Sequence, residues 1–336
     1  MAADVEKRFE LIKRNTVEII EENELKEVLK KKKPVVYLGT AITGTPHVGY
    51  FLWVLKLADF LKAGFKVKIL LADLHGALDN TPWNVLEKRY NYYAKVIPLM
   101  FKAIDVNIKD LEFIKGSSFQ LKKEYVFDVL RMSSFASAKE CKKASSEVVK
   151  FGDNPKLSGL IYPIMQALDE EYLRVDVQFA GLDQRKIMVF ARENLGKLGY
   201  KRRVEVMIPI IPGLVGEKMS ASDEKSKIDL LDDEETVKKK INNAECVAGN
   251  PNNGIMAFLK YVVMTIKEDR KEKFVVKRDK KYGGDLVYGD YRTIEKDFIN
   301  KKLHPLDLKN AVAEEINKLL KVFKKKELKK VKDLAY

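Results

Sequence analysis

The sequence predicts an α/β protein in which a Rossmann-like parallel-sheet domain with a helical insertion is followed by an α-helical domain. Two buried strand patterns flank one helical pattern within residues 35–72, as in a βαβ unit. Further strand patterns at 111–115 and 175–180 alternate with helical ones, which is typical of a parallel sheet. From about residue 234 the sequence becomes basic and helical. We therefore expect one domain over residues 1–228, with an insertion at about 83–156, and a second over 229–336.

Composition limits the class of protein. The chain has 336 residues and is 46% hydrophobic, which favours two domains over one. Its formal net charge of +14 is compatible with a polyanionic partner. Cys141 and Cys246 lie far apart and outside any metal-ligand spacing, as expected of reduced, intracellular thiols. No apolar run approaches the ~18 residues of a membrane span, and the first residues lack the apolar stretch of a signal peptide. These features predict a cytoplasmic protein with no membrane partner.

The first part of the chain, residues 5–33, predicts one or two amphipathic helices. Its basic run Lys30–Lys33 is interpreted as a solvated helix end, because cations complement the helix dipole there. Pro34 stops the helix and leads into the first strand.

The βαβ unit predicts an anion-binding site. A strand begins at Val35 and breaks into a loop that contains Gly39, Thr40, Thr43 and Gly44. Pro46 is predicted to open the helix and Gly64 to close it, and the second strand follows over 65–72. A loop and helix N-terminus of this kind present unpaired N–H groups to an anion, and His47 lies at the helix start.

Two side chains at the end of the second strand, Asp73 and His75, are predicted to point towards a cleft, because ligands collect beyond the carboxyl ends of parallel strands. A capping or loop-ordering role for Asp73 stays open. The following insertion contains Lys142 and Lys143, for which a phosphate contact and an exposed helix face are equally good interpretations.

A polar stripe is predicted in the helical pattern that begins the stretch 156–194. Tyr162, Gln166 and Asp169 are spaced i, i+4 and i+7, so they share one helical face inside an apolar segment. Buried polar groups need partners, so either the protein or a ligand must satisfy the stripe. Gln184 lies beyond the next strand end, and a hydrogen-bonded core network without a ligand remains an alternative.

A glycine- and proline-rich loop follows at residues 207–231. Within it Lys218, Ser220 and Ser222 offer an ammonium group and two hydroxyls to phosphate oxygens. Such a lysine beside serines is, by itself, more often part of a surface loop. The domain boundary is predicted near residues 225–235.

Two motifs together carry a family resemblance. PHVGY at 46–50 and KMSAS at 218–222 resemble the HIGH and KMSKS motifs of class I aminoacyl-tRNA synthetases. The stretches YPIMQALDEEYLRVD, FAGLDQRKI and HPLDLKNAV narrow this to tyrosyl-tRNA synthetases of the archaeal and eukaryotic cytoplasmic type, and the similarity covers nearly the whole chain. Tyr50 and Ala221 depart from the motifs as a mark of the subgroup.

The resemblance implies a tyrosine–tRNA ligase, with an anticodon-binding C-terminal domain and no appended module after it. It assigns the tyrosine phenol to Tyr37 and Asp169, and the amino-acid end of the substrate to Tyr162, Gln166 and Gln184. His47 and Lys218 would be catalytic, and ATP would be bound by Gly39, His47, Gly49, Lys218, Met219, Ser220 and Ser222. Contacts to tRNA would come from Arg185, Lys143, Tyr282 and Asp307.

The reaction implied by the resemblance needs positioning more than acid–base chemistry. A carboxylate attacks the α-phosphate of ATP and pyrophosphate leaves, so no catalytic base is required. The protein must supply donors to the phosphates, and Mg²⁺ would come with ATP rather than from a resident metal site. Partners would be L-tyrosine, ATP, tRNA(Tyr) and a second copy of the chain.

Three alternatives remain. A nucleotidyltransferase that makes a small cofactor shares the βαβ unit but would not need a basic helical domain. A synthetase-derived RNA-binding protein that has lost activation is compatible with the altered Tyr50 and Ala221. The tryptophanyl enzyme is the nearest rival within the synthetases, and the pairing of Tyr37 with Asp169 argues against it.

Overall fold

The computed structural model describes residues 2–214 and 227–336 of the chain. A six-stranded sheet forms its centre, with the strand order β1-β6-β5-β2-β3-β4. All neighbouring strands are parallel except β1, which pairs antiparallel with β6 at one edge. The strands are β1 (Glu18–Ile20), β2 (Val35–Ala41), β3 (Lys66–Ala72), β4 (Leu111–Lys115), β5 (Val177–Gly181) and β6 (Val204–Ile208).

The strand order reverses between β2 and β5. From β2 the chain moves outward through β3 and β4, and then returns to place β5 and β6 on the other side of β2. In open α/β sheets, the crevice beyond the carboxyl ends of strands at such a point is the usual ligand site. The topology therefore predicts a ligand site at the carboxyl ends of β2 and β5.

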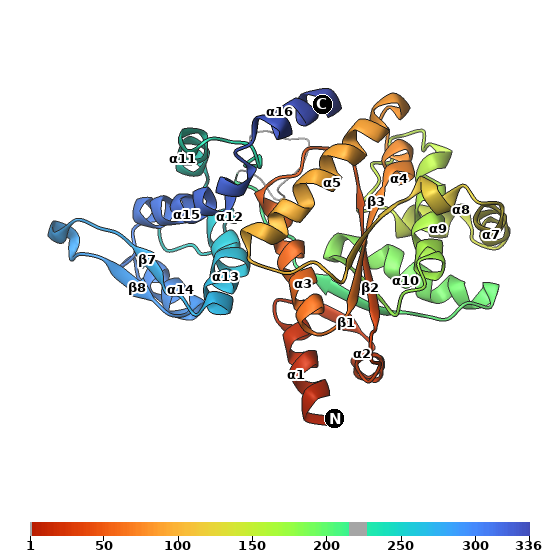
Figure 1. The fold of residues 1–336 in the computed structure, drawn as a ribbon, viewed down its shortest axis with the longest axis horizontal. Helices are drawn as coiled ribbons and strands as arrows, with labels where there is room; N and C mark the ends of the chain where they lie inside the picture. Colours follow the sequence, from red (N-terminus) through yellow and green to blue (C-terminus); the bar gives the residue numbers. More distant parts are fainter. Residues whose placement is uncertain (1, 215–226) are drawn as a thin grey trace.

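Helices cover both faces of the sheet (Figure 1), with α3 and α5 on one side and α7 to α10 on the other. The βαβ unit predicted from the sequence is confirmed, because α3 joins the parallel pair β2 and β3. The helices of this part are α1 (Ala2–Lys13), α2 (Glu22–Leu29), α3 (Phe51–Lys62), α4 (Asp73–Leu78), α5 (Leu86–Ala103), α6 (Ser117–Gln120), α7 (Lys123–Ser133), α8 (Ala138–Ala144), α9 (Leu157–Tyr172) and α10 (Arg185–Asn194).

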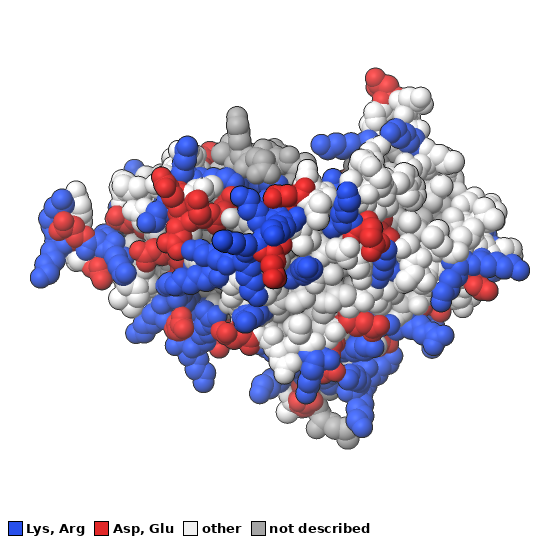
Figure 2. All heavy atoms as spheres, turned by 45° about the horizontal axis from the view of Figure 1, so that its top comes forward, with Lys and Arg blue, Asp and Glu red and all other residues white. Residues whose placement is uncertain are grey.

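The C-terminal part is helical, as predicted, with one small antiparallel pair of strands. Its elements are α11 (Glu234–Asn243), α12 (Gly254–Phe258), α13 (Met264–Arg270), β7 (Phe274–Val276), β8 (Leu286–Tyr288), α14 (Tyr291–Ile299), α15 (Pro305–Leu320) and α16 (Lys326–Ala335). Lysine and arginine side chains crowd the surface of this part, with acidic ones among them (Figure 2). Its helices share one continuous apolar core with α3 and α5.

An ion pair network joins the two parts. Arg14, at the end of the first helix, binds the buried Asp59 of α3 and also Asp269 of α13, at 2.8 Å between Nη1 and Oδ1. Lys62 reaches the same Asp269 at 2.7 Å. Because these residues come from both predicted domains, the network fixes how α13 lies against α3.

Two strands depart from the sequence prediction. Residues 5–33 contain the edge strand β1 between two helices, and three partly buried residues are too few to show an alternating pattern. Strand β6 is fully buried but carries Glu205 as its second residue, which breaks the apolar run that would have marked it. The helix predicted to open at Pro46 instead begins with a 3₁₀ turn at Val48–Tyr50, and His47 caps it.

Both cysteines are free thiols, Cys141 buried and Cys246 partly so. Over residues 2–214 and 227–336, none of the helices combines the length and the apolar character needed to cross a bilayer.

Candidate active site

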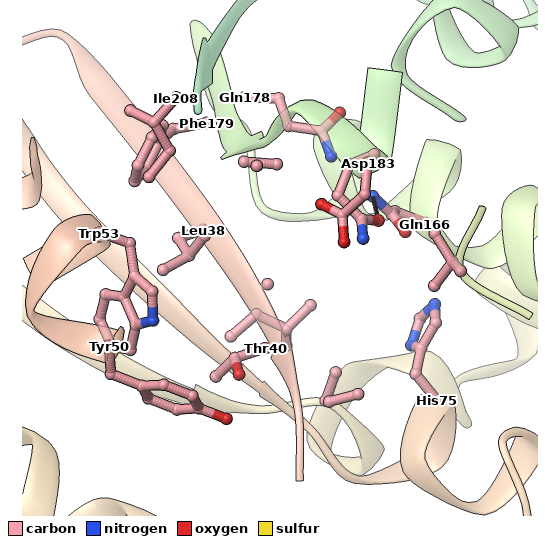
Figure 3. A pocket seen from close by; sticks show the side chains of 18 of the residues that line it. Leu38, Thr40, Tyr50, Trp53, His75, Gln166, Gln178, Phe179, Asp183 and Ile208 are labelled. Carbon is pink, nitrogen blue, oxygen red and sulfur yellow. Dashed lines mark hydrogen bonds between the residues drawn. The ribbon is translucent and has the colours of Figure 1, made fainter. Parts of the chain in front are cut away.

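A cavity of about 350 Å³ opens at the carboxyl ends of β2 and β5, where the strand order reverses. Figure 3 shows Tyr50 and Trp53 on one side of it, Gln166 and Asp183 on the other, and Leu38 and Thr40 of β2 between them. Eight of the residues assigned from the sequence line this one cavity: Tyr37, Gly39, His47, Gly49, Tyr162, Gln166, Asp169 and Gln184.

The deep end of the cavity is built around Asp169, which is 1% exposed. Its Oδ1 accepts hydrogen bonds from Gln120 Nε2 at 2.8 Å and from Tyr125 Oη at 2.9 Å. Its Oδ2 lies 3.9 Å from Nε2 of His75. Burial raises the pKa of Asp169 to about 8, in spite of these two donors, which lower it. The carboxyl group is therefore held rigidly from the protein side and faces the cavity with its other side.

Tyr37 completes the deep end. It is fully buried on β2, and its hydroxyl donates to the backbone oxygen of Gln166 at 3.3 Å. Burial and the nearby Asp169 raise the pKa of Tyr37 well above its ordinary value, so the phenol stays neutral. A neutral hydroxyl and a carboxyl group side by side can each exchange a hydrogen bond with a ligand hydroxyl.

The predicted stripe on α9 is confirmed, because Tyr162, Gln166 and Asp169 all face the cavity. Gln166 Nε2 donates to Gln184 Oε1 at 3.3 Å, and the Tyr162 ring meets the His75 ring edge-to-face at 4.7 Å between centroids. The two amides and the phenol line the cavity wall. The stripe is thus satisfied partly by the protein and partly open to a ligand.

His47 caps the helix start and lines the cavity. Its Nδ1 accepts the Gly49 N–H at 3.2 Å, which leaves Nε2 as the protonated nitrogen of a neutral ring. Burial, together with the charge of Lys227, lowers the pKa of His47 to about 3. The ring is therefore neutral at physiological pH and can donate one hydrogen bond from Nε2.

The chain after the second motif returns to the first. Val48 N donates to Ile228 O at 3.0 Å, His47 forms a backbone bridge with Asp229, and Lys227 Nζ donates to Thr45 Oγ1 at 2.5 Å. Four assigned residues of the second motif, Lys218, Met219, Ser220 and Ser222, lie outside the described residues. The described segment that follows them in the sequence, 227–229, lies next to PHVGY.

Tyr50, which stands where the family motif has its second histidine, has a defined environment. Its hydroxyl lies 3.2 Å from that of Tyr93, which in turn donates to Gly44 O at 2.6 Å. Its ring contacts the His47 ring edge-on at 4.9 Å. The phenol therefore links the motif to its own preceding loop.

For Asp73 the structure favours the loop-ordering alternative, and the predicted orientation towards the cleft is wrong. Asp73 is absent from the cavity wall formed by the described residues, and its Oδ1 accepts the Ser117 N–H at 2.8 Å. The same prediction is confirmed for His75, which lines the cavity. Asp73, the first residue after β3, turns towards α6, and only His75, the third, faces the site.

Sequence reasoning missed the partners of Asp169. Gln120 lies in the short helix α6 and Tyr125 in α7, within the predicted insertion, and neither belongs to a motif or to the stripe. Gln178 of β5 was missed too; it is buried, lines the cavity and pairs in register with Tyr37. The apolar, alternating character of β5 was the one signal that could have placed Gln178 on the site face.

The residues assigned to tRNA contacts lie outside the cavity, in two groups. Arg185 begins α10, where its guanidinium binds Glu18 through Nε at 2.6 Å and Nη2 at 2.8 Å, and Lys143 is exposed on the neighbouring α8. Tyr282 is 64% exposed in the turn before β8, and Asp307 lies in the first turn of α15. The second group is on the C-terminal part, as predicted.

The strand order of the parallel sheet reverses at the cavity, and an HxGx motif at a helix start lines it. This arrangement is the one expected of the class I aminoacyl-tRNA synthetases. The chain belongs to the class I tRNA synthetase family for tryptophan and tyrosine (W and Y), whose family model it matches over residues 29–321.

Similar proteins support this membership. The cytoplasmic tyrosine–tRNA ligase of Danio rerio is 51% identical, over 98% of this chain and 63% of its own length. That of Saccharomyces cerevisiae is 48% identical, over 94% of this chain and 83% of its own. The structure of the tyrosyl-tRNA synthetase of Archaeoglobus fulgidus, complexed with L-tyrosine, superposes with a TM-score of 0.87 at 37% identity, over 97% and 99% of the two chains. The chain spans less than two thirds of the length of the vertebrate relatives it matches, 63% for that of Danio rerio and 64% for that of Gallus gallus.

Proposed function

We propose that this chain is a cytoplasmic tyrosine–tRNA ligase. It activates L-tyrosine with ATP, giving tyrosyl-adenylate and pyrophosphate, and then transfers tyrosine to the 3′ end of tRNA(Tyr). The observation that carries the proposal is the buried pair of Tyr37 and Asp169 at the deep end of a cavity that opens at the first synthetase motif. The names of the similar proteins from fish and yeast agree with it.

The cavity wall suggests how the substrate lies. The phenol of tyrosine enters first and exchanges hydrogen bonds with Tyr37 and Asp169, while the aromatic ring fills the middle. Tyr162, Gln166 and Gln184 line the wall nearer the opening and hold the ammonium and carboxylate groups. The carboxylate is then presented towards the end of the cavity where His47 lies.

The ATP phosphates are proposed to meet the two motifs. His47 donates from Nε2, Gly39 and Gly49 leave the backbone accessible, and the start of α3 contributes its dipole. Lys218, Met219, Ser220 and Ser222 complete the phosphate contacts from the second loop. Mg²⁺ supplies charge neutralisation when it is bound to the phosphates of ATP. The protein groups then orient the α-phosphate for in-line attack and stabilise the charge that develops on it.

The test is ATP–pyrophosphate exchange with each of the twenty amino acids. We expect exchange with tyrosine alone, because the neutral phenol of Tyr37 and the carboxyl of Asp169 match one hydroxyl at the far end of an aromatic ring. Exchange with tryptophan would move the chain to the other specificity of its family. No exchange at all, with retained tRNA binding, would favour the RNA-binding protein without activation.

Transfer to tRNA is proposed to use two surfaces. Arg185 and Lys143, on neighbouring helices near the cavity, meet the acceptor end, and Tyr282 and Asp307 of the C-terminal domain 229–336 meet the anticodon. Arg185 is bound to Glu18 in the structure. A contact of Arg185 to a guanine of the acceptor stem would therefore replace one bidentate partner, the carboxylate, by another, the base edge.

We expect Asp307→Ala to weaken charging of tRNA that carries guanine as its first anticodon base. An ionised carboxylate can accept both N–H donors of the guanine Watson–Crick edge, and the exposed ring of Tyr282 offers a stacking surface. The preference over other bases at that position should relax by ~1–3 kcal/mol, while ATP–pyrophosphate exchange stays unchanged. Glu235→Ala, which removes an exposed first-turn acid of α11 in the same domain, is the matched control and should change neither charging nor base preference. A variant that keeps full preference and only melts earlier would return Asp307 to a helix-dipole role.

The chain is further proposed to form a homodimer through the predicted insertion. On and just before α7, four large apolar side chains are exposed: Leu121, Val126, Phe127 and Leu130. Apolar surface of this kind, gathered on one helix, is typical of an interface core.

Light scattering at micromolar concentration should therefore give twice the chain mass of 38.6 kDa. Phe127→Asp combined with Leu130→Asp should give the monomer, because two charges would have to be buried at the interface. Val275→Asp, an exposed apolar position on β7, should leave the dimer intact. A wild-type monomer that charges tRNA would contradict the proposal.

A further inference from the structure

The last helix of the chain contacts the loop of the first motif. Helix α16 lies along α5, with Leu328 and Ala335 buried in the shared core (Figure 1). This packing brings residues 332–336 to the loop 42–47, nearly three hundred residues away in sequence.

Two phenols donate to one backbone oxygen of that loop. Tyr336 Oη lies 2.6 Å from Gly44 O, and Tyr93 Oη of α5 lies 2.6 Å from the same atom. Tyr93 also contacts the hydroxyl of Tyr50 at 3.2 Å. A continuous path of hydrogen bonds therefore runs from the end of α16 through Gly44 to the last residue of the motif.

Arg89 of α5 holds the neighbouring carbonyls of the loop. Its guanidinium lies over the Tyr336 ring, 4.6 Å from the centroid, and its Nε donates to Ala335 O at 3.3 Å. The same guanidinium donates to the carbonyls of Thr43 and Ile42. The loop thus has three consecutive carbonyls, 42 to 44, directed to donors on α5 and at the end of α16.

A second contact reaches the motif from the other side. Lys332 Nζ of α16 lies 2.8 Å from Oδ2 of Asp229, a carboxylate that is 2% exposed. Asp229 forms the backbone bridge with His47, and its neighbour Ile228 accepts the Val48 N–H. Lys332 therefore fixes the segment that holds the catalytic histidine in place.

We propose that α16, through Tyr336 and Lys332, positions the ATP-binding loop of the first motif. The two residues touch neither tyrosine nor the phosphates; they act through Gly44 and Asp229. Without them the loop carbonyls and His47 lose a fixed arrangement, so ATP has to order the loop as it binds. The inference rests on the proposed function and goes beyond it, because it assigns part of ATP recognition to the end of the helical domain.

The test measures the KM values for ATP and for tyrosine separately in ATP–pyrophosphate exchange. Tyr336→Phe removes one hydrogen bond and should raise the KM for ATP about three- to tenfold, with the KM for tyrosine within about twofold. Lys332→Met should act in the same direction, and Lys332→Arg should restore the wild-type value. Lys329→Met, an exposed lysine of the same helix, is the matched control and should change neither KM.

Each outcome has a separate meaning. Wild-type exchange with unchanged KM values in Tyr336→Phe and Lys332→Met would overturn the inference and leave the proposed function intact. Equal rises in both KM values, or failure of Lys332→Arg to restore ATP binding, would show a general structural role and overturn it too. A wild-type chain without tyrosine-dependent exchange would overturn the proposed function and the inference together.

Discussion

Asp169→Ala is expected to abolish the discrimination between tyrosine and phenylalanine. Phenylalanine lacks the hydroxyl, so in the wild-type chain it would leave the buried Asp169 and Tyr37 without a ligand partner, and leaving such groups unpaired is costly. Discrimination of about 10⁵ is the value established for a tyrosyl-tRNA synthetase, and we adopt it as the starting point. The alanine variant has no carboxyl group that phenylalanine would leave unpaired, so the ratio of kcat/KM for the two amino acids should fall by several orders of magnitude.

Two controls separate this effect from damage to the fold. Asp73→Asn changes another buried aspartate of the same region, which binds Ser117 and does not line the cavity, so the ratio should stay at the wild-type value. Asp169→Asn keeps the shape of the side chain and a polar group, so it should give an intermediate ratio. An unchanged ratio in Asp169→Ala would remove Asp169 from the phenol site.

Asp169→Asn also has a predictable effect on stability. Between pH 3.8 and about 8 the folded chain retains a proton on Asp169 that the unfolded chain has released. Stability therefore falls as pH rises through this window, since the unfolded state binds fewer protons. Asparagine carries no charge, so the melting temperature of the variant should exceed that of the wild type increasingly up to about pH 8. Loss of discrimination in this variant would then not be a consequence of unfolding.

The second large effect is expected from His47→Asn. Asparagine can still cap the helix in place of the histidine Nδ1, but it is too short to replace the donor at Nε2. Removing one donor to a developing charge costs ~10²–10³ in rate, or ~2.7–4 kcal/mol. Single-turnover formation of tyrosyl-adenylate should slow by that factor, while tyrosine affinity measured without ATP stays unchanged.

Lys218→Ala is the companion variant from the second motif, and it should likewise lower the activation rate far more than tyrosine affinity.

Because the pKa of His47 is lowered to about 3, its ring does not titrate between pH 5 and 8. The pH profile of the His47→Asn variant should therefore have the same shape as that of the wild type over this range. Equal losses of rate and of tyrosine affinity would show that His47 acts on the shape of the whole site.

Much of the fold could be predicted because its patterns are local. The βαβ unit, strand β4 and helix α9 have apolar periodicities long enough to be seen in the sequence. Strand β1 could not be predicted, because its three residues pair with β6 only once the sheet has formed. Strand β6 was hidden by Glu205, whose burial depends on the neighbouring α9 and arginines rather than on its own segment.

The candidate site divides in the same way. The spacing of Tyr162, Gln166 and Asp169 on one helix is a local property, so their common face followed from the sequence, and PHVGY and KMSAS indicated the family. Asp73 and His75 are two residues apart, and only packing against α6 decided which one faces the cavity.

The sequence by itself determined the fold class and the family resemblance, because these depend on periodicity and on short motifs, and the resemblance in turn named eight residues that line the cavity. Tertiary structure alone decided that Gln120 and Tyr125 hold Asp169, that Asp229 bridges to His47, and that Tyr336 reaches Gly44. These contacts join segments up to 292 positions apart. Hydrogen-bond partners at such separations are set by how helices pack on the sheet, and the packing leaves no periodic trace in the residues that meet.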